Sequence, residues 1–182
     1  FVSIGAALIT NYVKTTYQAH VPLAVIGDTD ILAAAPMEMI TAGLGDILGK
    51  YTCLLDWKMA HIITGEYYCS HIADMVKEAV EIVVEESTRI KDRNPDAVKA
   101  VTEALVLSGI AMSFVGNSRP ASGSEHHLSH YWEMKFQAEG KKPILHGIKV
   151  GIGMIAVTKM YETLENEQFD FASLKERSFD YA

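Results

Sequence analysis

Between residues 70 and 92, apolar side chains recur at steps of three and four positions, which places them on one face of an α-helix. The charged residues of this stretch fall largely on the other faces. The apolar positions are Ile72, Met75, Val76, Ala79, Val80 and Val83. A helix with one apolar face must bury that face against another element. The pattern therefore predicts a domain built from packed helices.

Start and stop signals extend this prediction along the chain. Asp30 can cap a short helix, and Asn94 followed by Pro95 marks a stop and restart, with Asn as N-cap and Pro at the first helical position. Gly116 is expected to end that helix, and Ser173 has the capping-box spacing of a last one. The expected helical ranges are 30–35, 37–64, 70–92, 95–115, 124–138, 145–163 and a segment from 173. The sequence therefore predicts a short β segment followed by a helical domain of about six helices.

The first 27 residues have a different pattern. Short apolar or alternating runs at 4–9, 13–17 and 21–27 are expected as strands. Three short strands with no helix between them cannot bury both faces, which suggests a missing partner. Phe1 is not an initiator Met, and the last residues stop within a helical pattern. We therefore expect a fragment of a larger protein.

Composition excludes several classes of partner. The net charge is −7 and no basic stripe is visible, so nucleic acid is not expected as a partner. An acidic surface disfavours anionic membranes, and no uninterrupted apolar run reaches the roughly 18 residues of a membrane span, so no membrane insertion is expected. The two cysteines fit no metal or disulfide pattern, and the N-terminus does not resemble a signal peptide. These features favour a cytoplasmic location.

Four of the seven histidines lie between residues 126 and 146. His126 and His130 are four residues apart, which puts both on one helix face with Cβ atoms about 5–6 Å apart. The pair can hold one metal ion, or place one imidazole on a metal and the other on a substrate. A zinc-protease helix would need Glu directly after the first His, where His127 stands, so that interpretation fails. A polar surface beside a helix start remains the alternative.

Two further residues extend the candidate site. His146 follows a short hairpin that returns the chain towards the first histidines, although it can equally be a packing residue. Asp46 lies in an apolar, Gly-rich helix, where a buried unpaired carboxylate is costly and needs a cation; an exposed Asp is the alternative. A dinucleotide-binding loop is rejected because Leu48 occupies a required glycine position. On the later helix, Gly151 and Gly153 are expected to allow close packing.

Two imidazoles and one carboxylate form a common three-ligand set for a catalytic divalent ion, leaving one position open for substrate. Zn²⁺ suits this set best among the common ions. Ni²⁺ and Fe²⁺ accept the same donors, so the sequence leaves the metal open.

Three segments, GLGDILGKYTCLLDWKMAH, SRPASGSEHHLSHYWEM and LHGIKVGIGMI, resemble sn-glycerol-1-phosphate dehydrogenases of the iron-containing alcohol dehydrogenase and dehydroquinate synthase superfamily. The phrase VPLAVIGDTDILAAAP resembles the link between that family's two domains. The resemblance implies a mainly α fold: residues 36–182 would form the C-terminal helical, metal- and substrate-binding domain of a dehydroquinate synthase-like fold. Residues 1–35 would be a short β remnant of the N-terminal α/β NAD(P)-binding domain, with its linker.

The resemblance also implies an activity: reversible hydride transfer between NAD(P)H and dihydroxyacetone phosphate, giving sn-glycerol 1-phosphate. It assigns the metal ligands to Asp46, His126 and His146. Asp46 and His130 match catalytic, substrate-contacting positions, with His130 suited to orient a substrate hydroxyl or relay its proton. Ser3 matches a residue at the cofactor. The family's Gly-rich pyrophosphate loop is absent from these residues, so we expect the fragment alone to be inactive.

Several alternatives remain at this point. Iron-type alcohol dehydrogenases have a further His ligand where Lys50 stands, which favours the three-ligand subgroup. Lys50 and Arg119 could bind the phosphate of a small-molecule substrate, or could equally be solvated surface cations. Glycerol dehydrogenase is the nearest rival, and dehydroquinate synthase is disfavoured because it prefers Glu at the position of Asp46. A non-catalytic helical metal-binding module is the rival from a different class. A homo-oligomer is expected for the full-length protein by resemblance.

Overall fold

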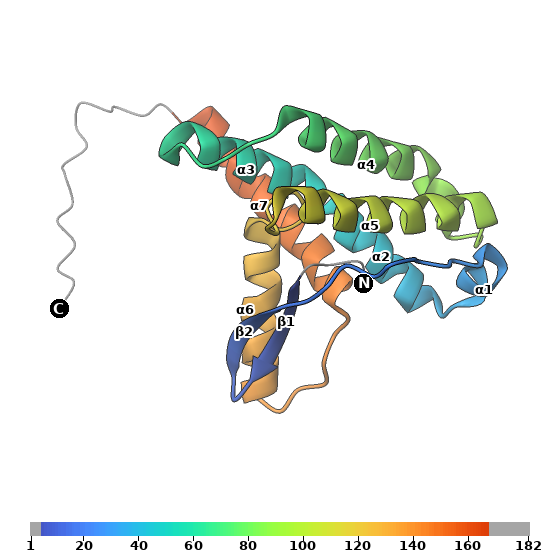
Figure 1. Cartoon of the computed structure of the whole chain (residues 1–182). Helices are drawn as coiled ribbons and strands as arrows, with labels where there is room; N and C mark the ends of the chain where they lie inside the picture. Colours follow the sequence, from blue (N-terminus) through green and yellow to red (C-terminus); the bar gives the residue numbers. More distant parts are fainter. Residues whose placement is uncertain (1–4, 168–182) are drawn as a thin grey trace, which may run out of the picture.

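Figure 1 shows the computed structural model, which describes residues 5–167. A two-stranded antiparallel hairpin comes first, made of β1 (Gly5–Thr10) and β2 (Val13–Gln18). The helices that follow in the described part are α1 (Thr29–Ala34), α2 (Met37–Leu48), α3 (Lys50–Thr64), α4 (Ser70–Ile90), α5 (Pro95–Val115), α6 (Ser124–Ala138) and α7 (His146–Asn166). The mainly helical fold with a small β entry is therefore as the sequence predicted.

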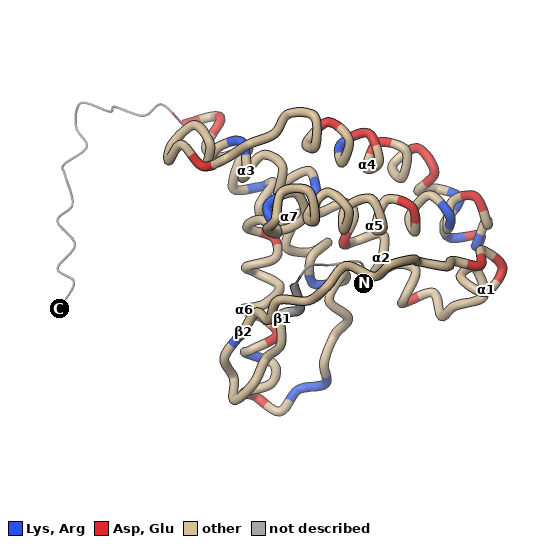
Figure 2. Tube along the Cα trace, viewed as in Figure 1, with Lys and Arg blue, Asp and Glu red and all other residues tan. Residues whose placement is uncertain are grey.

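The main hydrophobic core lies where α2, α4 and α5 meet, with α4 and α5 running side by side (Figure 1). Val80 and Val83 of α4 are buried there against Val98 and Val101 of α5, with Ile40 from α2. The predicted apolar face of α4 thus points into the core. Its acidic residues line the opposite, outer side, shown in red in Figure 2.

Helix α5 begins and ends where its local signals predict. The Asn94 side chain accepts hydrogen bonds from the backbone N–H groups of Asp96 at 3.0 Å and Ala97 at 3.2 Å, and Pro95 takes the first helical position. At the other end, Gly116 adopts the left-handed conformation with φ 78°, which favours glycine. By length and composition this helix could cross a membrane, but a buried core helix passes the same test, so that is weak evidence.

Asn94→Ala is expected to lower the free energy of unfolding by about 1 kcal/mol, because two backbone donors at the start of α5 lose their acceptor. Urea unfolding followed by circular dichroism measures this. Asn94→Asp keeps an accepting oxygen at the same place and should retain most of the stability. Equal losses in the two variants would contradict a capping role.

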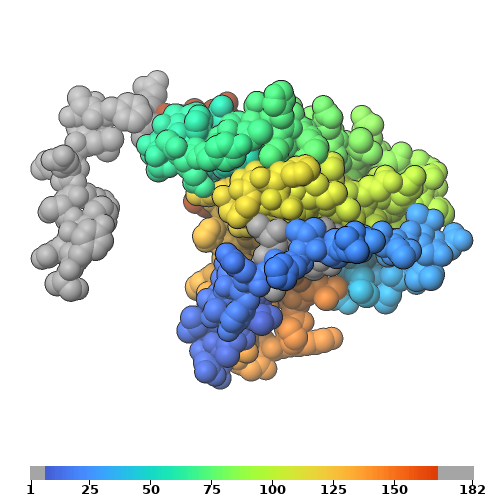
Figure 3. Space-filling view, viewed as in Figure 1, coloured from blue at the N-terminus to red at the C-terminus, as the bar shows by residue number. Residues whose placement is uncertain are grey.

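The structure corrects three of the local predictions. Residues 21–27 form no strand; a strand requires a hydrogen-bonded neighbour, and Pro22 also lacks a backbone donor. This segment instead crosses the surface beside α5, as the blue chain in Figure 3 shows. Asp28, rather than Asp30, caps α1 by accepting from two backbone N–H groups. The predicted 37–64 helix is divided at Gly49. The segment from 173 lies outside the described residues.

Helices α2 and α7 touch through a glycine seam formed by Gly45, Gly147 and Gly151. A Cβ atom on Gly45 would lie 2.3 Å from the Gly147 carbonyl oxygen, and one on Gly147 would lie 1.8 Å from the Ala42 carbonyl oxygen. The two backbones are therefore in direct contact, and the close packing predicted at Gly151 is confirmed. Gly153 does the same against α6, since its Cβ would lie 2.7 Å from the Glu125 carbonyl oxygen.

Candidate metal centre

Three residues from three helices converge beside the glycine seam. Asp46 comes from α2, His126 from the first turn of α6 and His146 from the first residue of α7. Asp46 Oδ1 lies 3.4 Å from His126 Nε2 and 3.7 Å from His146 Nε2. One donor atom from each residue lies within 4.8 Å of the others. The structure thus brings together the three side chains that the sequence placed in one site.

The two carboxylate oxygens of Asp46 have different environments. Oδ2 accepts a hydrogen bond from Lys50 Nζ at 3.1 Å, whereas Oδ1 is buried and no donor reaches it within the described part of the chain. Burial acts to raise the pKa of Asp46, but Lys50 and the two histidines outweigh it and hold the pKa well below its usual value. An ionised oxygen without a donor, facing two imidazole nitrogens, is a set of donors that fits a divalent cation.

His126 is oriented by its neighbour in the sequence. Its Nδ1 lies 2.8 Å from Oε1 of Glu125, a fully buried carboxylate. Glu125 also accepts from Thr52 Oγ1 at 2.6 Å and from the Gly123 backbone N–H at 2.7 Å. Burial acts to raise the pKa of Glu125, but these hydrogen bonds lower it below the usual value. Glu125 thus faces Nδ1 of His126, while Nε2 is the ring nitrogen that lies towards Asp46.

His146 presents a neutral imidazole to the same point. Burial lowers its pKa to about 4, helped by the neighbouring His126 and opposed by Asp46. Its Nδ1 lies 3.4 Å from the hydroxyl oxygen of the buried Ser129 on α6. The neutral form is the one in which a histidine nitrogen binds a metal.

The start of α6 is anchored on α3 and α7. The backbone N–H of Ser124 donates to Asp56 Oδ2 at 2.6 Å, and the Tyr161 hydroxyl donates to Asp56 Oδ1. Burial and this bond raise the pKa of Tyr161, which therefore stays protonated. Gly123 is required at this approach, since its Cβ would lie 2.7 Å from the Cys53 Cα. These contacts fix the turn that carries His126.

His130 lies one helical turn beyond His126 and borders the same cluster. Its ring centroid is 5.5 Å from that of His146, and its Nδ1 is 3.6 Å from Glu133 Oε2. Burial lowers its pKa to about 4, helped by Lys14 on β2. Glu133 also pairs with the buried Lys149 at 3.3 Å. His130 is therefore a half-buried histidine beside His146.

Sequence reasoning missed Glu125, Glu133 and Lys149. The last two could have been found by spacing, because Glu133 is three residues after His130 and Lys149 is three after His146, which puts each pair on one helix face. Glu125 carried no such signal, since a charged residue in the first turn of a helix usually faces solvent.

Both cations considered for a substrate phosphate are paired with protein groups in the structure. Lys50 is buried, and its ammonium group donates to Asp46 and to the Ala121 carbonyl oxygen at 2.8 Å. Arg119 forms a two-point pair with Glu66, with N–O distances of 2.6 and 2.5 Å. Lys50 is therefore a structural cation here and not a solvated surface cation, whereas the Arg119 side chain is paired but 36% exposed. Ser3 lies outside the described residues.

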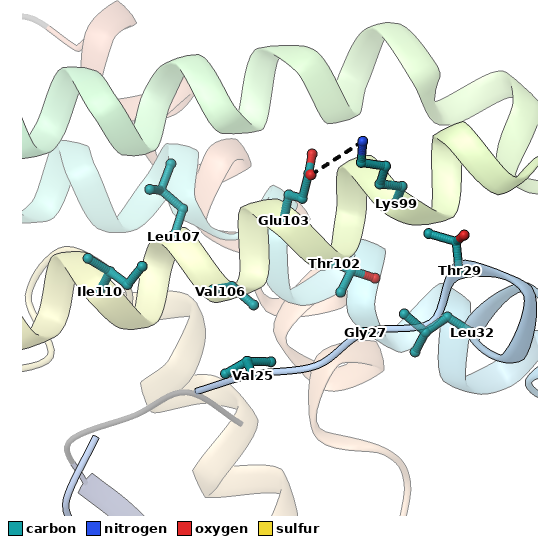
Figure 4. Close-up of a pocket in the computed structure, with 10 residues that line it drawn as sticks. All are labelled: Val25, Gly27, Thr29, Leu32, Lys99, Thr102, Glu103, Val106, Leu107 and Ile110. Atoms are coloured by element: carbon teal, nitrogen blue, oxygen red, sulfur yellow. Dashed lines mark ion pairs between the residues drawn. The ribbon is translucent and has the colours of Figure 1, made fainter. Parts of the chain in front are cut away.

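A separate pocket of about 330 Å³ lies between α5 and the segment that leads into α1 (Figure 4). Its walls are mainly apolar, with Val25, Leu32 and Ile110 among them, and its one ion pair joins Lys99 to Glu103 at 3.6 Å. It shares no lining residue with the metal cluster. The group of residues that could hold a metal ion therefore lies in the Asp46, His126 and His146 cluster and not in this pocket.

Fold and site together define a helical domain with a two-histidine, one-aspartate group suited to a divalent metal. No protein-family model matches the chain. Relatives named glycerol-1-phosphate dehydrogenase (NAD(P)+) do match. The Halalkalibacterium halodurans protein is 43% identical over 162 residues, covering 89% of this chain and 41% of the relative. The Bacillus subtilis protein is 40% identical over 167 residues, which cover 92% of this chain and 42% of the relative. The Methanosarcina acetivorans protein is 39% identical over 159 residues, which cover 87% of this chain and 44% of the relative.

The chain is therefore homologous to glycerol-1-phosphate dehydrogenases over nearly all of its length, which confirms the resemblance seen in the sequence. It spans about two fifths of the length of these relatives.

Proposed function

We propose that this chain forms the metal- and substrate-binding helical part of an NAD(P)-dependent sn-glycerol-1-phosphate dehydrogenase. The reaction is reversible hydride transfer between dihydroxyacetone phosphate and sn-glycerol 1-phosphate. The observation that carries the proposal is the convergence of Asp46 Oδ1 with the Nε2 atoms of His126 and His146, in a chain homologous to such enzymes.

Each residue of the cluster has a separate task in this proposal. Asp46, His126 and His146 hold a divalent ion, with Zn²⁺ the best fit to their donors and Ni²⁺ or Fe²⁺ compatible. When bound, such an ion polarises the substrate C2 oxygen as a Lewis acid. His130, neutral and one turn away, holds a substrate hydroxyl or accepts and returns its proton. Asp46 borders both the ion and the substrate.

The remaining assignments extend the same proposal. Residues 1–35 belong to the NAD(P)-binding domain and its linker, residues 36–182 form the helical domain, and Ser3 lies at the cofactor. The substrate is a small phosphorylated molecule, the full-length protein is a homo-oligomer, and the location is cytoplasmic. Because no Gly-rich pyrophosphate loop occurs within these 182 residues, a polypeptide of this length alone is expected to be inactive.

Substrate comparison tests the proposal in the full-length protein. Turnover of dihydroxyacetone phosphate with NADH or NADPH is expected, chelation of the metal should abolish it, and added Zn²⁺ should restore it. Activity that survives complete metal removal would count against the proposed site.

Glycerol dehydrogenase remains the second candidate because both cations considered for a phosphate are engaged elsewhere. Initial rates with glycerol and with sn-glycerol 1-phosphate, measured side by side in the oxidative direction, separate the two. A clear preference for glycerol would replace the first proposal with the second.

A further inference from the structure

Glu125 is a buried acidic residue beside the candidate ligands, and the proposed function gives it no role. Lys50 neutralises Asp46, and its ammonium group donates to Asp46 and to the Ala121 carbonyl oxygen. The carboxyl group of Glu125 is fully buried behind His126, on the side away from Asp46. A buried carboxylate is costly unless its partners compensate for lost water. The partners of Glu125, of which His126 is one, therefore indicate why this carboxyl group is buried here.

The imidazole ring of His126 connects Glu125 to the candidate metal site. Glu125 Oε1 lies 2.8 Å from His126 Nδ1, and the opposite nitrogen of that ring, Nε2, lies 3.4 Å from Asp46 Oδ1. If Nδ1 donates its proton to Glu125, the lone pair of His126 is on Nε2, which is the nitrogen that faces the cluster. Carboxylates that accept from the outer nitrogen of a metal-binding His fix its tautomer and make it a stronger ligand.

Glu125 is itself held from two sides. Thr52 on α3 donates to Oε2 at 2.6 Å, and the Gly123 backbone N–H donates to Oε1 at 2.7 Å. With His126, this makes three donors, so the carboxylate has little freedom to turn away. A group that only closed the start of α6 would need the Gly123 contact alone.

We propose that Glu125 is a positioning residue: it orients His126 in the Nδ1–H tautomer and thereby sets the metal affinity of the site. This inference rests on the proposed metal centre. Glu125 touches neither substrate nor reacting atoms, so its effect is transmitted through His126.

The test measures Zn²⁺ affinity by competition with a chromophoric chelator, using the full chain. Glu125→Gln keeps the shape and the accepting oxygen but removes the charge, and should weaken Zn²⁺ binding roughly 10-fold or more, within the roughly 10- to 100-fold range typical of such partners. Glu125→Met also removes the acceptor and should weaken it further. Glu162→Gln removes an exposed carboxylate of α7 that pairs with Lys159, and should bind Zn²⁺ like the wild type.

A second readout does not depend on metal, and its wild-type result does not depend on a variant that folds. Long-range ¹H–¹⁵N spectra of the metal-free wild type, with ¹⁵N-labelled histidine, should show His126 as the Nδ1–H tautomer. Glu125→Met should shift it towards Nε2–H, whereas Glu125→Gln should not. A purely structural Glu125 would alter unfolding without moving either the tautomer or the affinity of the folded chain.

The outcomes separate the two proposals. Wild-type Zn²⁺ binding that Glu125→Gln leaves unchanged overturns the role of Glu125 and leaves the metal centre standing, as does an Nε2–H tautomer in the wild type. If the wild type binds no Zn²⁺, the metal centre and the affinity effect both fail, and the tautomer spectrum still decides whether Glu125 orients His126.

Discussion

Asp46→Asn is expected to reduce the Zn²⁺ content of the purified chain from stoichiometric to background. Asp46 supplies the only anionic donor of the three, and an amide nitrogen facing the imidazoles can neither bind a cation nor attract one. Asn is preferable to Ala because its oxygen can still accept from Lys50, whose ammonium group is buried. Removing that partner altogether would leave an uncompensated charge and confuse metal loss with unfolding.

Metal analysis by mass spectrometry after dialysis against Zn²⁺ measures the effect. His146→Ala should give the same loss, and both should remove activity from the full-length protein. Asp74→Asn makes the same chemical change on the exposed side of α4 and serves as the control. Stoichiometric Zn²⁺ in both site variants would show that the ligands are assigned wrongly.

Gly147→Ala is expected to lower the free energy of unfolding by about 3 kcal/mol or more, in spite of the better helix propensity of Ala. Its Cβ would lie 1.8 Å from the Ala42 carbonyl oxygen, so backbone atoms rather than a flexible side chain must move. Because α7 would have to move away from α2, the distance between His146 and Asp46 should also increase and Zn²⁺ binding should weaken.

Gly43→Ala on α2 is the matched control. Its Cβ would meet Val101 Cγ1 at 3.2 Å, which a side chain can relieve by a small shift, so its stability should stay near that of the wild type. Urea unfolding of the three proteins gives the comparison. Equal stability of the two variants would mean that α2 and α7 are not in backbone contact in solution.

Local signals predicted the helices well because those signals act over a few residues. Asn94, Pro95 and Gly116 each satisfy or end backbone hydrogen bonds at their own position, and the structure has α5 bounded by them. The expected strand at 21–27 is wrong because a strand depends on a distant neighbour that no local pattern specifies. Gly49, which separates α2 from α3, also has a distant neighbour: its Cβ would lie 2.7 Å from Val150 Cγ1, about a hundred residues away.

The candidate site, like the fold, could be predicted from the sequence only in part. The meeting of Asp46, His126 and His146 was predictable from residue type and resemblance, whereas their metal-binding role stays a prediction. Burial of Lys50 and Glu125 was not predictable, because charged residues in helices are usually exposed and only tertiary packing brings their partners to them. For Lys50 the sequence left a phosphate ligand and a solvated surface cation as equal alternatives, and in the structure it is a partner of Asp46.

Main-chain contact between α2 and α7 determines which substitutions this protein can accumulate without harm. In a core of side chains, a larger residue can be compensated by a smaller neighbour so that the total volume is kept. Where two backbones touch, no side chain is present that could become smaller. We expect sequence drift in the α4–α5 layer to be absorbed by repacking there, with the separation of Asp46 and His146 preserved. A lineage could thus diverge widely over most of its surface and core while the spacing of these two side chains stays constant.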